Sequence, residues 1–183
     1  VLYGNAYVPR SSYDNELLLQ QSDGSFVALA GFPGGGDTRS VVLGDVDGDG
    51  RLDVLVGNGN GDWRGAVESY AIGRSNELLL QQSDGSFVAS ASFPGGSANT
   101  RSVALGDVDG DGNEDFAIGS QKHSDMHVQS GKVYLMKSHQ DGLDSPARSF
   151  LGAGAKNFLG LHIASAGYID ADARPDLLLG ATG

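Results

Sequence analysis

The stretch Gly44-Asp45-Val46-Asp47-Gly48-Asp49-Gly50 recurs further along the chain, because residues 106–112 have the identical sequence GDVDGDG. A longer stretch, NELLLQQSDGSFVA, occupies residues 15–28 and again residues 76–89. The two offsets are 62 and 61 residues, so both mark one repeating unit. An altered third copy of the acidic stretch, GYIDADA, lies at residues 167–173. Self-similarity at a fixed period indicates a repeat architecture.

Each repeat contains four short runs that are typical of β-strands. In the first repeats they cover residues 16–20, 25–30, 39–44 and 52–57, and the first two recur at 77–81 and 86–91. Gly, Asp, Asn or Pro bounds each run, and the Asp-Gly pairs at 23–24 and 84–85 are typical of tight hairpins. We find no sustained 3.6-residue apolar period and expect negligible helix.

Four antiparallel strands per unit, repeated radially, predict an all-β fold built of β-propeller blades. A right-handed β-solenoid is the competing architecture, but its rungs are much shorter than this period. We divide the chain into repeats at residues 1–53, 54–115 and 116–176, with a last strand at 177–183. Three blades would leave unpaired strand edges, so we expect this propeller segment to be part of a larger propeller or of an assembly of copies.

Composition and charge exclude several classes of protein. The formal net charge of −11 disfavours nucleic acid, whose phosphates attract basic surfaces. The chain has no cysteine, which excludes disulfides and thiolate metal sites. No apolar stretch approaches the roughly 18 residues of a membrane span.

The acidic loops carry aspartate at positions 1, 3, 5 and 9, and position 7 offers a main-chain carbonyl. The residues are Asp45, Asp47, Asp49, Arg51 and Asp53 in the first loop, and Asp107, Asp109, Asp111, Asn113 and Asp115 in the second. Alternate carboxylates in a tight turn converge on one point, and together with water they supply the six to eight oxygens that Ca²⁺ prefers. Mg²⁺ is disfavoured, because it rarely takes an all-protein cage.

Two other interpretations of these loops are weaker. Asp-Gly turns can be solvated hairpin connections, but two full copies in register between apolar runs argue against that. An EF-hand begins in the same way but requires a glutamate at position 12, where both loops have an apolar residue.

The third loop has lost ligands. It keeps Asp170, Asp172 and Asp176 and the carbonyl of Arg174, but Tyr168 replaces the first aspartate. With one carboxylate fewer, we expect weaker Ca²⁺ binding or an empty site.

Residues 40–53 and 102–115, together with the Asn-Glu-Leu-Leu-Leu and Asp-Gly-Ser-Phe segments, resemble VCBS/FG-GAP repeats. Residues 131–135, 157–160 and 177–182 resemble the integrin α-subunit variant of that family. Leu159 interrupts its Phe-Gly signature, and Thr182 stands where the family usually has proline. The resemblance implies a seven-bladed, Ca²⁺-stabilised propeller on an extracellular or cell-surface protein.

Three functions fit these observations. We rank first a structural, adhesion or protein-interaction module, whose partner is another protein or further copies joined through open blade edges. A glycan-binding lectin comes second, because Trp63 beside Arg64 can stack on a sugar. An accessory domain of a polysaccharide-degrading enzyme comes last. We expect no catalysis within these residues, since no cysteine or Gly-x-Ser-x-Gly motif supplies a nucleophile and nearly half of the 23 acidic residues lie in the metal loops.

Overall fold

The structure is a computed structural model that describes residues 15–59, 75–91, 99–125, 127–139, 142–143, 148–170, 172 and 174–183. Within these residues every regular element is a strand, and no helix is long and apolar enough to cross a membrane. The strands are β1 (Leu18–Gln20), β2 (Phe26–Ala28), β3 (Asp37–Gly44), β4 (Asp53–Gly59), β5 (Glu77–Gln81), β6 (Phe87–Ala89), β7 (Ser102–Gly106), β8 (Asp115–Ser120), β9 (Lys132–Met136), β10 (Ser138–His139), β11 (Gly142–Leu143), β12 (Arg148–Leu151), β13 (His162–Gly167) and β14 (Asp176–Gly180).

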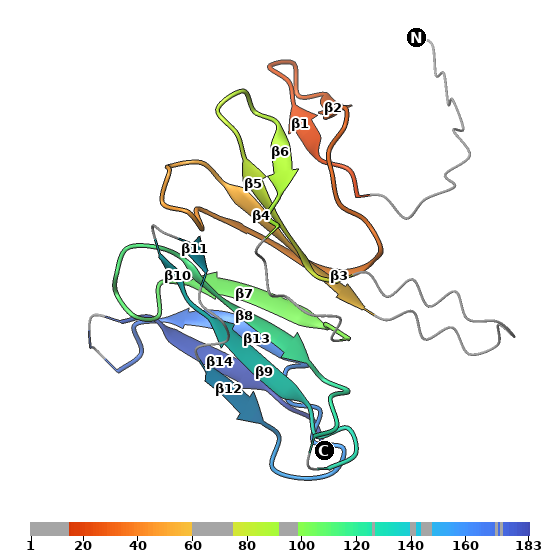
Figure 1. The fold of residues 1–183 in the computed structure, drawn as a ribbon, viewed down its shortest axis with the longest axis vertical. Helices are drawn as coiled ribbons and strands as arrows, with labels where there is room; N and C mark the ends of the chain where they lie inside the picture. Colours follow the sequence, from red (N-terminus) through yellow and green to blue (C-terminus); the bar gives the residue numbers. More distant parts are fainter. Residues whose placement is uncertain are drawn as a thin grey trace, which may run out of the picture.

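Two four-stranded antiparallel sheets form the centre of the molecule. Their strand orders are β3-β4-β5-β6 and β12-β9-β8-β7, and the pairs β1-β2, β10-β11 and β13-β14 form two-stranded sheets. The main sheets follow one another along the long axis of the molecule (Figure 1). This arrangement confirms the all-β, antiparallel blade architecture. The sheets begin at β3 and β7, so the divisions after residues 53 and 115 fall just after the first residue of the second strand of a blade.

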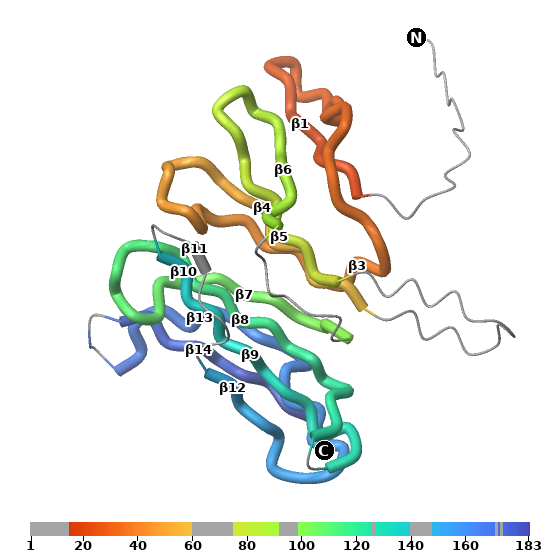
Figure 2. The backbone as a smooth tube through the Cα atoms, viewed as in Figure 1, coloured from red at the N-terminus to blue at the C-terminus, as the bar shows by residue number. Residues whose placement is uncertain are grey.

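The two short sheets near the ends of the chain are complementary halves of a blade. The hairpin β1-β2 has the same sequence as β5-β6, the last two strands of the first full blade. The pair β13-β14 matches the first two strands of a blade, because Gly167 pairs with Asp176 as Gly44 pairs with Asp53. The described residues therefore run from a half-blade that matches the third and fourth strands, through two full blades, to a half-blade that matches the first and second strands (Figure 2).

The core lies between successive blades. Leu55 and Leu78 of the first full blade belong to one buried cluster with Val103, Leu105 and Phe116 of the second. Burial of such side chains removes apolar surface from water and holds the blades together.

The strand β7 contributes to two interfaces. Val103 and Leu105 face the preceding blade, whereas Ala104 belongs to a second cluster with Val133 and Ile163. This follows from the two-residue alternation of side chains along a strand.

Repeated polar contacts fix the same spacing between blades. The Ser40 hydroxyl accepts a hydrogen bond from the Val103 main-chain nitrogen at 3.2 Å. The Ser102 hydroxyl accepts the equivalent bond from Ile163 in the next blade at 2.9 Å. The two serines are 62 residues apart, so the repeat reproduces the contact between blades as well as the blade itself.

The hairpins at residues 15–28 and 76–89 form as the Asp-Gly pairs predict, with a longer loop than the tightest type. In the first, Gln21 donates its main-chain N–H to Ser25 at 2.7 Å. The loop between them ends at Gly24, whose φ of 83° is the left-handed conformation that such loops require. Asp23 caps the turn by accepting from the Ser25 main-chain nitrogen at 2.9 Å.

Candidate metal centre

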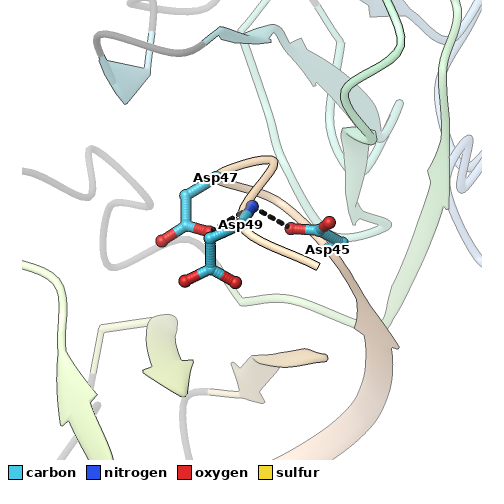
Figure 3. A group of neighbouring side chains, drawn as sticks. All are labelled: Asp45, Asp47 and Asp49. Atoms are coloured by element: carbon cyan, nitrogen blue, oxygen red, sulfur yellow. Dashed lines mark hydrogen bonds between the residues drawn. The ribbon is translucent and has the colours of Figure 1, made fainter. Parts of the chain in front are cut away.

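The first acidic loop joins β3 to β4 and gathers three carboxylates. Asp45, Asp47 and Asp49 each offer an oxygen, and these oxygens lie within 4.8 Å of one another (Figure 3). The Asp49 main-chain nitrogen donates to Asp45 at 3.0 Å and to Asp47 at 3.3 Å. The Gly50 main-chain nitrogen donates to the second oxygen of Asp45 at 2.8 Å. The loop backbone therefore holds the carboxylates side by side.

This spacing fits a single calcium ion. Two oxygens that bind the same Ca²⁺ at about 2.3–2.6 Å are at most about 5 Å apart, and the three oxygens of the first loop satisfy that limit. Ionised carboxylates at such distances repel one another unless a cation lies between them. Asp45, Asp47 and Asp49 would hold the ion, which would supply the missing positive charge.

The second loop repeats the arrangement between β7 and β8. Oxygens of Asp107, Asp109 and Asp115 lie within 4.8 Å of one another. The Asp111 main-chain nitrogen donates to Asp107 at 3.0 Å and to Asp109 at 3.2 Å, as Asp49 does in the first loop. Gly112 donates to the second oxygen of Asp107 at 2.9 Å, as Gly50 does to Asp45.

The aspartate at position 9 of each loop also accepts main-chain hydrogen bonds, a role that the sequence did not predict. Asp53 is fully buried and accepts main-chain hydrogen bonds from Val46 at 3.1 Å and from Gln81 at 2.8 Å. It therefore ties the start of the loop to the third strand of its blade.

Asp115 does the same in the second blade. It accepts from Val108 at 3.0 Å and from Ser138 at 2.9 Å. The two convergent groups differ in membership, because the first includes Asp49 and not Asp53, whereas the second includes Asp115 and not Asp111.

Burial sets the acidity of the position 9 carboxylates. Loss of solvation raises the pKa of Asp53 and raises the pKa of Asp115 to about 6, against the opposing effect of their main-chain hydrogen bonds. Asp109 behaves differently, because its hydrogen bond to Lys137 lowers its pKa.

A basic side chain contacts each carboxylate group. Lys137 Nζ lies 2.6 Å from Asp109 Oδ2, and the Arg51 guanidinium forms an ion pair with Asp49. Arg51 Nε also donates to the Gln81 carbonyl at 2.9 Å. Sequence reasoning assigned only the main-chain carbonyl of Arg51 to the site and missed Lys137, which lies 28 residues from its partner. These cations offset part of the negative charge and would compete with a metal ion for the carboxylates.

The position 7 residues make one contact in common. The main-chain N–H groups of Arg51, Asn113 and Arg174 each donate to the aspartate two residues earlier, at 2.9, 2.8 and 2.7 Å. These turns define the backbone around the carbonyls predicted to bind calcium, and metal ligation by those carbonyls stays a prediction.

The third loop keeps part of the frame. Asp176 accepts from the Ile169 main-chain nitrogen at 2.8 Å, and Asp172 donates its own N–H to Asp170 at 3.1 Å. Among the described residues, convergent groups of three carboxylates occur in the first two loops and not in this one. Weaker or absent binding here stays a prediction, and Trp63 and Arg64 lie outside the described residues.

Comparison with known proteins agrees with this geometry. A family model described as "FG-GAP-like repeat" matches residues 3–56 and 57–118, which contain the first and second metal loops. No curated protein matches the chain.

Proposed function

The chain belongs to the FG-GAP-like repeat family, and on this basis we propose that it is a calcium-stabilised, extracellular propeller module for protein interaction or adhesion. The two convergent aspartate groups carry the proposal, because each lies at the turn between the first and second strands of a blade. A cation there would hold those strands at a fixed separation.

The metal role is structural. The oxygens of each group belong to one short turn and hydrogen-bond to its own backbone, so a bound ion stiffens the turn. Ligand binding would couple to folding, since the metal-free carboxylates repel one another. We propose no catalytic activity. The glycan-binding alternative depends on Trp63 and Arg64, and no described residue favours it.

Calorimetric titration of CaCl₂ into the chelator-stripped chain tests the metal sites. We expect two sites, and a higher melting temperature with calcium than with chelator, because ligand binding to the folded state stabilises it. Asp49→Ala should remove one site and leave the second loop loaded. An unchanged melting temperature and no heat of binding would refute the proposal.

The interaction role needs a separate experiment. The calcium-loaded chain is applied to immobilised extracellular matrix proteins and to a glycan array under the same conditions. We expect calcium-dependent binding to protein. Binding to glycans alone, lost in Trp63→Ala, would replace this role by the lectin.

A further inference from the structure

A cavity of about 210 Å³ lies at the end of the first and second strands of the blades opposite to the metal loops. Arg39 lies near the start of β3, Arg101 directly precedes β7, and Lys122 follows β8. These three residues line the cavity together with Asn99, Gln121 and Leu161.

The cavity is built from one repeated position in three successive blades. Ser40 pairs with Gly57, Ser102 with Gly119, and His162 with Gly180, so these three residues are equivalent. The residues directly before them are Arg39, Arg101 and Leu161, and all three line the cavity. The stacking of blades therefore brings two equivalent arginines to one opening.

The two arginines differ in how their charge is compensated. Asp37 forms an ion pair with Arg39 at 2.5 Å. The equivalent residue in the next blade is Asn99, 62 positions later, which cannot neutralise Arg101. Among the residues that the structure describes, no carboxylate forms an ion pair with Arg101. In a chain with a formal net charge of −11, this cavity thus contains a guanidinium that no described carboxylate neutralises.

We propose that this cavity binds a carboxylate, donated by an aspartate or glutamate side chain of a protein partner. The carboxylate of the ligand would form an ion pair with Arg101, as Asp37 does with Arg39. Guanidinium–carboxylate pairs are directional and roughly twice as strong as hydrogen bonds between neutral groups. The amides of Asn99 and Gln121 can donate to the same oxygens.

The lining favours an acidic peptide over an acidic sugar. Among the described residues that line the cavity none is aromatic, so this part of the site offers no ring on which a sugar could stack. This inference rests on the proposed role in protein interaction and adds the chemistry that the partner must present.

The test uses the ¹⁵N-labelled, calcium-loaded chain and NMR titration. The probe is the peptide acetyl-Gly-Ser-Asp-Asp-Asp-Ser-Gly-amide, and its Asn-for-Asp counterpart is the matched control. We expect shifts of the Arg101 and Gln121 side-chain signals with the acidic peptide and not with the neutral one. Shifts that are equal for both peptides, or no shifts at millimolar peptide, would overturn the proposal.

Three variants separate the site from general charge effects. Arg101→Gln should weaken binding about tenfold or more, because it removes the charged partner of the carboxylate. Asn99→Asp should weaken it comparably, since it recreates within the chain the ion pair of Asp37 and Arg39. Arg148→Gln, an exposed arginine on β12, should bind like the unmodified chain.

The outcomes remain distinguishable from failure of the proposed function. Unaltered peptide binding in Asn99→Asp would refute carboxylate binding in the cavity, but it would leave the proposed calcium stabilisation and partner binding elsewhere on the chain intact. Tenfold tighter binding of a trigalacturonate probe than of the acidic peptide would overturn the assignment to a protein partner.

Discussion

At the scale of single residues, the burial of Asp115 conflicts with its place in a group of acids suited to a cation, because burial favours the neutral form and cation binding requires the ionised form. It is fully buried and caps two main-chain N–H groups, and it also belongs to a cluster of acids that fits a cation. Its ionised form is disfavoured by burial, which raises its pKa from 3.8 to about 6. A bound calcium ion, as proposed, would resolve the conflict by favouring the ionised form.

A pH dependence follows for the metal-free chain. Between about pH 4 and pH 6 the folded state holds a proton on Asp115 that the unfolded state has released. The contribution of this group to the free energy of unfolding is therefore present at low pH and decreases as pH rises, by about 3 kcal/mol at most. Urea unfolding in chelator measures it as the difference between the unmodified chain and Asp115→Asn. A difference that stays constant from pH 4 to pH 7 would contradict this.

At the scale of elements, the connection between β12 and β13 passes so close to Gly119 of β8 that only glycine fits there. A Cβ added at Gly119 would lie 2.3 Å from the carbonyl oxygen of Gly160, and backbone cannot move aside as a side chain can. We expect Gly119→Ala to lower the free energy of unfolding by about 1–3 kcal/mol, the usual cost of overpacking. Gly154→Ala is the control, since nothing lies within 4 Å of its added Cβ. Equal melting temperatures for the two calcium-loaded variants would show that the blades can separate locally.

The strands and turns were also the features that the sequence predicted best, better than the contacts at the site. The strands, their antiparallel order and the acidic turns follow from local patterns that the repeat shows twice. The start of β3 at Asp37, two residues before the predicted run, depends on pairing with Gly59 and could not be read locally.

The contacts of Lys137 and Asp53 at the metal loops could not be predicted from the sequence either, because they also depend on the pairing of strands. Lys137 reaches Asp109 only because β9 packs beside β8, and Asp53 meets Gln81 only because β5 pairs with β4. Spacing along the chain does not encode such cross-strand contacts.

At the scale of the whole molecule, the two half-blades correspond to different strands of one blade, the third and fourth in β1-β2 and the first and second in β13-β14. Among the described residues β14 pairs only with β13, whereas its equivalent β4 also pairs with β5. The hairpin β1-β2 has the sequence of β5-β6 and pairs with no other described strand. We therefore expect β1 of a second copy to pair with β14, which places the Gln20 N–H at Asp176 as Gln81 meets Asp53.

The exposed apolar faces support this pairing between copies. Val41 and Leu43 of β3 are 49% and 53% exposed, while their equivalents Val103 and Leu105, covered by a neighbouring blade, are 7% and 9% exposed. At the other end Leu178 is 65% exposed, although its equivalent Leu55 is buried. A second copy can cover these faces as one blade covers the next.

Light scattering on the calcium-loaded chain of these 183 residues tests the association. We expect a mass that rises above 18.9 kDa with increasing concentration, because covering the exposed faces removes apolar surface from water. Leu178→Lys should reduce association, since it puts a charge on a face that must be buried. Val128→Lys is the matched control, because Val128 is 67% exposed in a connection between strands. A monomer at every concentration, or equal association of both variants, would contradict pairing between the half-blades.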